Sequence, residues 1–404
     1  MATSIASLRV GSGISTRRSG RSALDESLTN ALEPLGGGAP DLVLLFVAPQ
    51  HEDELAAIVS LANEGSGDAV VLGCVAGGII GPSREVEDAP AVAAWAARLP
   101  GTSVRPFRAT FGEDGEQGYF DGFDEFPPRA RKAVMVMLAD PFTFPAHLLL
   151  DHLNERAPGM PVIGGMASGA LAAGRTRLIF GDEIHRDGAV GAVLEGGVEL
   201  RSVVSQGCRP VGETFAVTRS ERNVVYELGG MSALSRIEEL YAAADERDRL
   251  LIRRGLHVGQ ATTETKPELR QGDFVIRNLV GVDQATGAIA ISDVVEVGQT
   301  LQFQVRDAES ARADLRAMLE RERREAGVGV AGALLFSCNG RGQALFGQPD
   351  HDVGAVRSAF GDVPVAGFFA AGELGPVGQR NFVHGFTASL LLVRDRENEA
   401  RSAV

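Results

Sequence analysis

Short apolar runs recur along the chain, and segments with helical periodicity follow them. One run is Leu42–Val47, and two others occupy residues 133–138 and 332–337. Uninterrupted runs of this length are typical of strands that are buried on both faces. After the first two runs, residues 52–65 and 144–159 place apolar side chains at helical spacing. The pattern predicts mixed sheets faced by helices.

Three apolar segments share the glycine pattern G-x-x-A-x-G, in each case about thirty residues after the start of an apolar run. The copies begin at Gly73, Gly164 and Gly367, and we call the surrounding segments, residues 71–82, 162–173 and 365–376, the three glycine segments. A further strand candidate follows each copy, within residues 92–99, 190–200 and 382–393. Matching surroundings indicate an internal repeat. We therefore predict an α/β (mixed α+β) fold built from repeated strand–helix–strand units in two domains.

The middle of the chain follows a different pattern. Residues 232–254 are predicted to form one charged amphipathic helix, and Ala308–Ala326 a second. Between them we expect strands at 256–260 and 274–279, a hairpin turn at 285–287 and a further turn at Gly298.

The domain boundary is placed at Gly229-Gly230, after two repeat units and before the first charged helix. This position divides the chain into domains 1–230 and 231–404. The acidic segment 113–131 is predicted to link the first two repeat units.

Composition excludes several classes of function. The chain has 39 Lys and Arg against 53 Asp and Glu, a net charge of −14, which repels nucleic acid and anionic membranes. No apolar stretch approaches the roughly 20 residues that span a bilayer. The three cysteines, Cys74, Cys208 and Cys338, lie far apart without metal-type spacing. We therefore expect a cytoplasmic protein.

Motifs in both halves of the chain carry a resemblance to a known family. In the C-terminal half they are SCNGRG (337–342), FG (346–347), GFFAAGELGP (367–376) and NFVHGFTAS (381–389). In the N-terminal half they are PDLVLLFV (40–47), VLGC (71–74), IGGMASG (163–169) and SQGCRPVG (205–212). These motifs resemble the FIST family, named for F-box and intracellular signal transduction proteins.

The resemblance implies an N-terminal and a C-terminal FIST domain. In the family this pair is thought to form a sensory module for small ligands, with amino acids as candidates. Because no kinase, methyl-acceptor or cyclase segment is recognisable, we expect the output to pass through a signalling protein partner or through oligomerisation.

Polar residues among the C-terminal glycines give the first set of candidate ligand-binding residues. The set consists of Asn339, Arg341, Gly342, Gly372, Glu373, Gly375, His384 and Thr387. Arg341 could hold a ligand carboxylate through two hydrogen bonds and Glu373 could hold an ammonium, an arrangement that suits a zwitterion. The alternative is a structural ion pair between Arg341 and Glu373, with His384 bonded to a backbone carbonyl.

Glycine-rich turns give the second set, because a ligand can approach backbone N–H groups where no Cβ intervenes. The set consists of Gly73, Cys74, Gly77, Gly78, Gly165 and Ser168, with Arg209 beside Cys208 added for its charge. The alternative is that the glycines serve close packing or positive φ, and that the cysteines are packed thiols.

Three functions remain open. The leading one is a sensor that binds a small molecule without catalysis, cofactor or metal, because the three glycine segments lack the first-glycine spacing of G-x-G-x-x-G and the sequence lacks P-loop, H-E-x-x-H and G-x-S-x-G patterns. The second is an enzyme acting on a small polar metabolite through Cys338 or Glu373. The third is an adaptor that binds a protein partner through the charged helices.

Overall fold

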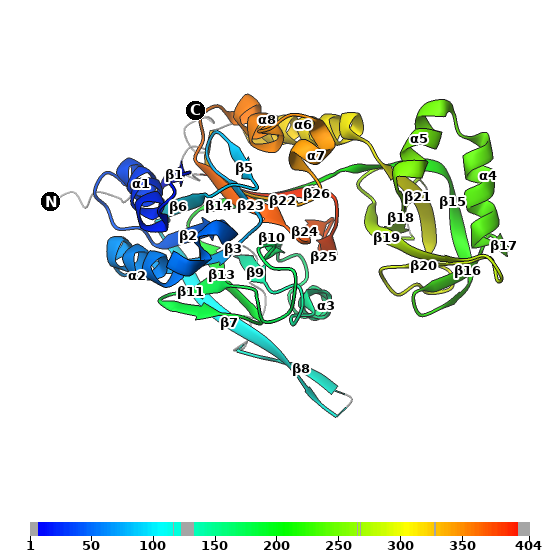
Figure 1. Ribbon diagram of the computed structural model, residues 1–404, viewed down its shortest axis with the longest axis horizontal. Helices are drawn as coiled ribbons and strands as arrows, with labels where there is room; N and C mark the ends of the chain where they lie inside the picture. Colours follow the sequence, from blue (N-terminus) through cyan, green and yellow to red (C-terminus); the bar gives the residue numbers. More distant parts are fainter. Residues whose placement is uncertain are drawn as a thin grey trace. The chain divides into compact units, whose positions relative to one another are not determined.

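The computed structural model describes residues 7–115, 117–122, 133–264, 266, 268–326 and 329–394. They form two compact units. Unit 1 consists of Met1–Val204, Arg316–Val383 and Thr387–Val404, and unit 2 of Ser205–Leu315 and His384–Phe386. The predicted mixed α+β fold with helix-flanked mixed sheets is confirmed (Figure 1).

Unit 1 contains three sheets. In spatial order, sheet 1 consists of β1 (Arg9–Ser15), β6 (Val92–Arg98), β2 (Leu42–Val47), β3 (Val70–Val75), β11 (Leu178–Phe180) and β12 (Glu183–His185). Sheet 2 consists of β8 (Gln117–Asp121), β7 (Thr102–Asp114), β13 (Ala189–Gly196), β9 (Ala133–Ala139), β10 (Val162–Met166), β24 (Glu373–Val377) and β25 (Arg380–His384). Sheet 3 consists of β14 (Glu199–Gln206), β26 (Thr387–Arg394), β22 (Val330–Cys338), β23 (Val365–Ala370), β4 (Gly78–Ile80) and β5 (Glu85–Glu87).

The three sheets share one strand order. Each has a central parallel pair, namely β2 with β3, β9 with β10, and β22 with β23. An antiparallel strand lies on one side of each pair, and this strand is β6, β13 or β26. On the other side lies a two-stranded hairpin, which comes from a different part of the chain.

The hairpins are exchanged in a cycle. The hairpin that follows β3 joins sheet 3, the one that follows β10 joins sheet 1, and the one that follows β23 joins sheet 2. Each glycine segment includes the second strand of a parallel pair and leads towards the hairpin that joins another sheet. Each sheet is therefore completed by a hairpin that follows the parallel pair of another sheet.

The inner faces of the three sheets share one apolar core. The rings of Phe46, Phe336 and Phe368 meet there, with ring centroids 5.3 to 6.3 Å apart. Trp95 is also in this core and is 1% exposed. Burying one such aromatic side chain contributes about 1.5–3 kcal/mol, so the shared core is a major source of the stability of unit 1.

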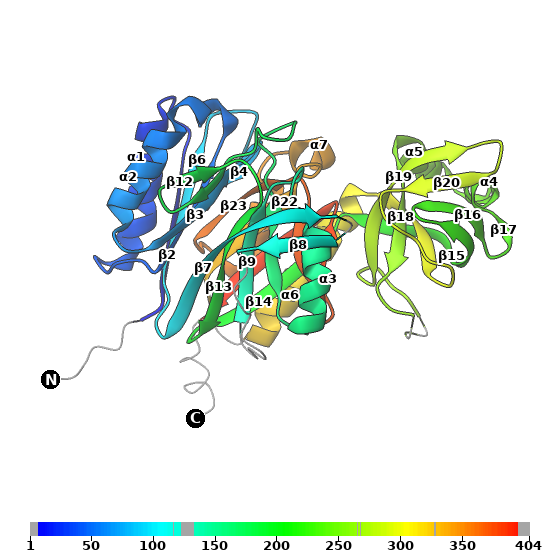
Figure 2. The same ribbon diagram turned by 90° about the horizontal axis from the view of Figure 1, so that it is seen from below.

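Helices cover the outer faces. α1 (Gly20–Leu32) and α2 (Leu55–Ser66) lie side by side on sheet 1, as Figure 2 shows, and α3 (Ala146–Arg156) packs on sheet 2. The sequence explains this placement, because α2 buries Leu55, Ile58, Val59 and Ala62, which occupy one helix face. The remaining helical segments of unit 1 are η1 (Glu33–Leu35), η2 (Pro49–Glu54), α7 (Gly342–Phe346) and α8 (His351–Phe360). α7 and α8 link β22 to β23.

Unit 2 is a closed antiparallel barrel. Its strands are β15 (Cys208–Glu221), β21 (Thr300–Arg306), β18 (Leu256–Ala261), β19 (Phe274–Asp283), β20 (Ala288–Ile291) and β16 (Val224–Leu228), and β17 (Met231–Ser232) extends the sheet. β15 also pairs with β16, which closes the barrel. Val258, Ile289 and Phe303 belong to its apolar core.

The prediction of a single charged helix at residues 232–254 is wrong. The segment forms α4 (Ala233–Ala243) and α5 (Glu246–Arg254). Asp245 separates them because its side chain accepts a hydrogen bond from the backbone N–H of Asp248 (2.7 Å) and caps the second helix. The second charged helix, α6 (Ala308–Ala326), has its predicted bounds.

The predicted link at residues 113–131 begins inside a hairpin, because β7 and β8 pair between Thr110 and Asp121. Residues 123–131 of this link lie outside the described residues.

Candidate ligand-binding site

The three glycine segments meet in unit 1, and Ser168 joins them. Its hydroxyl accepts a hydrogen bond from the backbone N–H of Gly77 (3.0 Å) in the first segment. The same hydroxyl donates to the backbone carbonyl of Phe369 in the third segment. Ser168 belongs to the second segment, so one side chain holds all three together.

The first glycine of each segment allows close strand packing. A Cβ at Gly73 would lie 2.1 Å from the carbonyl oxygen of Leu45 on the neighbouring parallel strand. At Gly164 and Gly367 the corresponding distances to neighbouring carbonyl oxygens are 1.8 and 1.7 Å. Only glycine fits such an approach, so packing accounts for these three residues.

Protein atoms also occupy the space beside the other predicted glycines of these segments. A Cβ at Gly78 would lie 2.6 Å from the ring of Phe369, and one at Gly165 would lie 2.7 Å from the Cβ of Ala370. Gly77 is exposed, with the carbonyl oxygen of Ser168 3.3 Å from its Cβ position. Packing therefore suffices at these positions, and ligand contact there stays a prediction.

The cysteines are buried free thiols. Burial raises the pKa of Cys74, so this thiol is unreactive at neutral pH. Cys338 ends β22, and its Sγ lies 3.8 Å from Oδ1 of Asn339.

Arg341 lies in a turn between β22 and α7, with its side chain fully buried. Its Nε and Nη2 donate to the two carboxylate oxygens of Asp352 at 2.7 and 2.8 Å, and the two side chains are 0% and 1% exposed. Ser337 and His351 also bond to this carboxylate, at 2.5 and 2.8 Å. Burial opposes ionisation, but the Arg341 charge and these hydrogen bonds hold the pKa of Asp352 well below its usual range.

Glu373 begins β24 and is 0% exposed. Its Oε2 accepts two hydrogen bonds from Thr387, from the backbone N–H (3.0 Å) and the hydroxyl (2.8 Å). Burial raises the pKa of Glu373 to about 8, although Thr387, the Cys338 thiol and the Arg341 charge each favour the ionised form. The expected partner of Arg341 was Glu373, but the ion pair is made with Asp352.

Within the described part of the chain, Arg341 and Glu373 each have one buried polar atom without a partner. Among the described residues, Nη1 of Arg341 and Oε1 of Glu373 have no hydrogen-bond partner. The two side chains influence each other electrostatically, since the Glu373 carboxylate raises the pKa of Arg341 and the Arg341 charge lowers that of Glu373. The cluster therefore offers a donor and an acceptor inside the protein.

The hairpin of β4 and β5 supplies residues to this cluster that sequence analysis missed. Glu85 is 6% exposed, and its Oε1 accepts from the backbone N–H of Val353 (2.8 Å) at the start of α8. Burial, with the nearby Asp352 charge, raises the pKa of Glu85 to about 8. No motif marks Glu85 or Asp352, because both look like surface carboxylates in the sequence.

Gly342 has a structural role in the same cluster. Its φ is +59°, and a Cβ would lie 2.6 Å from the carboxylate of Glu87, which accepts from the backbone N–H of Gln343 (2.9 Å). A side chain at this position would displace Glu87 from the start of α7.

The remaining predicted residues are divided between the units. Gly372 accepts a backbone hydrogen bond from Met166 (2.8 Å), and a Cβ at Gly375 would lie 2.4 Å from the Val204 side chain. His384 and Arg209 belong to unit 2. Arg209 bonds to Asp248 and to Asp307, the latter at 3.0 Å, so its charge is already balanced by two carboxylates.

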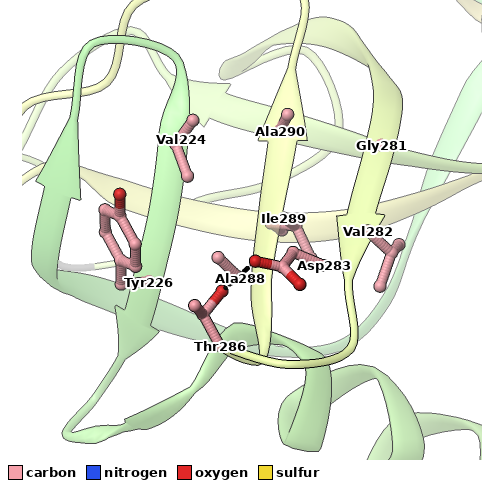
Figure 3. A pocket seen from close by; sticks show the side chains of 9 residues that line it. All are labelled: Val224, Tyr226, Gly281, Val282, Asp283, Thr286, Ala288, Ile289 and Ala290. Carbon is pink, nitrogen blue, oxygen red and sulfur yellow. Dashed lines mark hydrogen bonds between the residues drawn. The ribbon is translucent and has the colours of Figure 1, made fainter.

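A separate hollow of about 400 Å³ lies on β16, β19 and β20 of unit 2 (Figure 3). It is lined by Val224, Tyr226, Gly281, Val282, Asp283, Thr286, Ala288, Ile289 and Ala290. Its one carboxylate, Asp283, bonds to the Thr286 hydroxyl (2.7 Å) in the hairpin turn. The hollow therefore lacks the unpaired charged groups that mark the Arg341–Glu373 cluster.

The described residues contain neither a metal-ligating cluster nor a membrane-spanning helix. No group of three or more His, Cys, Asp or Glu side chains among them could hold a metal ion. No helix in the described part of the chain is long and apolar enough to cross a bilayer.

Comparison with known proteins identifies the class. The chain matches the FIST N domain over residues 41–231 and the FIST C domain over residues 233–376, and it belongs to the FIST family. An uncharacterized protein of Mycobacterium tuberculosis strain H37Rv is 42% identical over 388 residues, which cover 96% of this chain and 100% of that protein. An uncharacterized protein of Mycobacterium bovis is 41% identical over 388 residues, covering 96% and 99%. FIST domains are associated with sensing in signal transduction.

Proposed function

We propose that the chain is a cytoplasmic sensory protein that binds a small polar ligand at the Arg341–Glu373 cluster. One observation carries the proposal, namely that Nη1 of Arg341 and Oε1 of Glu373 are buried without partners. Such atoms each cost about 1–3 kcal/mol when they stay unsatisfied. A ligand that bonds to both recovers this cost and so binds more tightly to the folded protein.

Amino acids are the ligand class that we infer. The two residues lie in the CNGRG and AGELGP motifs, which carry the family resemblance. Glu373 would accept hydrogen bonds from the ligand ammonium, and Nη1 of Arg341 would donate to its carboxylate. Nε and Nη2 of Arg341 already donate to Asp352. The carboxylate of the ligand would therefore receive one hydrogen bond from this guanidinium.

The family architecture supports a sensory role. We infer that domains 1–230 and 231–404 act together as the N-terminal and C-terminal FIST domains, since Glu85 of the N-terminal domain accepts a hydrogen bond from the backbone N–H of Val353, next to Asp352 in the C-terminal one. The three-fold strand order in unit 1 supports an internal repeat. A signalling protein partner would receive the output, and the charged helices α5 and α6 are candidate surfaces for it.

Thermal-shift screening tests the proposed function. The twenty common amino acids are tested as free acids, C-terminal amides and N-acetyl derivatives. A ligand present at a hundred times its Kd adds about 2.7 kcal/mol to stability, which is a readily measured shift. The Glu373→Gln variant should lose the response, and Glu155→Gln, an exposed glutamate on α3, should keep it. A flat response to all three forms overturns the proposal.

An enzyme is the second candidate, favoured by one specific observation. The Cys338 thiol lies near Glu373 and favours the ionised form of its carboxyl, whose pKa burial raises to about 8. The Cys338 thiol and the Glu373 carboxyl could transfer a proton between them while the Cys338 sulfur attacks a substrate. Incubating any ligand found by the screen with the protein for hours, and following it by NMR, separates the two functions. An unchanged ligand supports the sensor, and turnover that is lost in Cys338→Ser supports the enzyme.

A further inference from the structure

The charges of the Arg341–Glu373 cluster do not balance. Arg341 and Asp352 form a two-point ion pair inside the protein, and their side chains are 0% and 1% exposed. The one positive charge is therefore matched by one negative charge at hydrogen-bonding distance. Glu373 and Glu85 are further buried acids of the cluster, and neither forms an ion pair within the described part of the chain.

Of the described residues, the cation that acts on Glu373 is Arg341, which is already paired with Asp352. β10 places Gly165 opposite Glu373. β26 contributes Thr387, and β22 contributes the Cys338 thiol.

β25, the neighbouring strand in the sheet, carries two ionisable residues. They are Arg380, whose side chain is 60% exposed, and His384. Arg380 pairs with Asp151 (3.6 Å), so its charge is directed to the surface.

An isolated carboxylate inside a protein is costly, and two outcomes relieve the cost. The carboxyl can hold a proton, or a cation can bind beside it. A ligand ammonium would be such a cation, and Oε1 of Glu373 is the atom left to receive it. A ligand carboxylate at the same atom would add a second negative charge and be repelled.

We propose that the site selects ligands that carry a primary ammonium group, and that binding of this group expels a proton from Glu373. The inference rests on the proposed function of the same site. No covalent bond to the ligand is formed in this step. The neutral carboxyl loses its proton to solvent, and the ammonium forms an ion pair with the resulting carboxylate. For a ligand that carries the ammonium without a carboxylate, such as the C-terminal amide, charge in the site is the same before and after binding.

The pH dependence follows from this exchange. Burial raises the pKa of Glu373 to about 8, so at pH 7 about nine-tenths of the free protein carries the proton. The affinity for an ammonium ligand should therefore increase about tenfold for each unit that the pH rises towards 8, as long as the ligand amine itself stays protonated. At pH 7 about 0.9 proton should leave for each ligand bound.

Isothermal titration calorimetry at pH 7, in phosphate and in Tris, measures this proton directly. The slope of the observed enthalpy against the buffer ionisation enthalpy gives the number of protons released. The ligands are one amino acid, its C-terminal amide and its N-acetyl derivative. The amide keeps the ammonium without the carboxylate, and the N-acetyl form keeps the carboxylate without the ammonium.

The expected result is binding of the free acid and the amide with release of about 0.9 proton, and at least tenfold weaker binding of the N-acetyl form. Glu373→Gln should bind the amide more weakly, without proton release, and the Glu155→Gln control should behave as the natural protein. Equal binding of the N-acetyl form, or binding without proton release, overturns the inference and leaves the sensor proposal standing. No binding by any form overturns both.

Discussion

Arg341 holds both carboxylate oxygens of Asp352 from a position eleven residues earlier in the chain, and solvent reaches neither side chain. This pair decides the chemistry of the site. It uses the guanidinium face that sequence analysis assigned to a ligand. It also leaves Glu373, the other acid of the predicted cluster, without an ion pair among the described residues, although the Arg341 charge still acts on it.

Asp352→Asn should be strongly destabilising. The variant leaves the Arg341 charge buried with a neutral partner, and breaking a buried ion pair in this way costs about 3–5 kcal/mol. Urea unfolding measures the change. Asp362→Asn is the matched control, because Asp362 pairs with Arg357 at the surface, with side chains 88% and 42% exposed. That pair should contribute less than about 1 kcal/mol. Equal losses in the two variants would show that the buried pair has no special role.

Gly367→Ala should prevent folding or yield little folded protein. The added methyl would lie 1.7 Å from the carbonyl oxygen of Leu335, and backbone cannot move aside cheaply in a central strand. Gly354→Ala in α8 is the control, since no atom lies within 4 Å of its Cβ position. That change should stabilise the protein by about 0.5–1 kcal/mol. Soluble yield and melting temperature compare the two variants. Normal folding of Gly367→Ala would contradict the packing explanation of the glycine segments.

Stability should fall as the pH rises from about 5 to about 8. The pKa of Glu85 and that of Glu373 are each raised from 4.5 to about 8, so the folded protein binds more protons than the unfolded chain across this range. Their contribution is complete below 4.5 and is lost as the pH passes 8. Each group should add a slope of up to about 1.4 kcal/mol per pH unit.

Urea unfolding at several pH values measures this slope. Glu85→Gln and Glu373→Gln should each reduce it, whereas Glu155→Gln should leave it unchanged. The same pH dependence in Glu85→Gln, Glu373→Gln and the natural protein would mean that these two acids are ionised at little cost in the folded protein.

Sequence patterns predicted the local elements of this fold well. The apolar run Leu42–Val47 is a strand with the predicted bounds, and the helix Ala308–Ala326 is equally well placed. Both depend on periodicity within one segment. The exchange of hairpins between sheets could not be predicted, because the pairing of Gly165 with Glu373 joins residues more than two hundred positions apart without any local signal.

The candidate site was predicted in part. The CNGRG and AGELGP motifs pointed to Arg341 and Glu373, and the structure brings these two residues into one electrostatic cluster. The partner of Arg341 was missed, because Asp352 looks like an ordinary acid at the start of a surface helix. The role of the glycines was also open in the sequence, since glycine serves close packing and ligand approach equally well. The distance from Gly367 to Leu335 favours packing.

Carbon-13 NMR of the glutamate carboxyl groups, followed from about pH 3 to about pH 10, tests the central claim most directly. Glu373→Gln and Glu85→Gln assign the two shifted resonances. An uncompensated buried Glu373 should titrate with a midpoint of about 8 in the free protein, and the midpoint should fall when an ammonium ligand binds. A midpoint at the ordinary value of 4.5 would show that Glu373 already has a counter-charge, and the proton-exchange account of this site would be wrong.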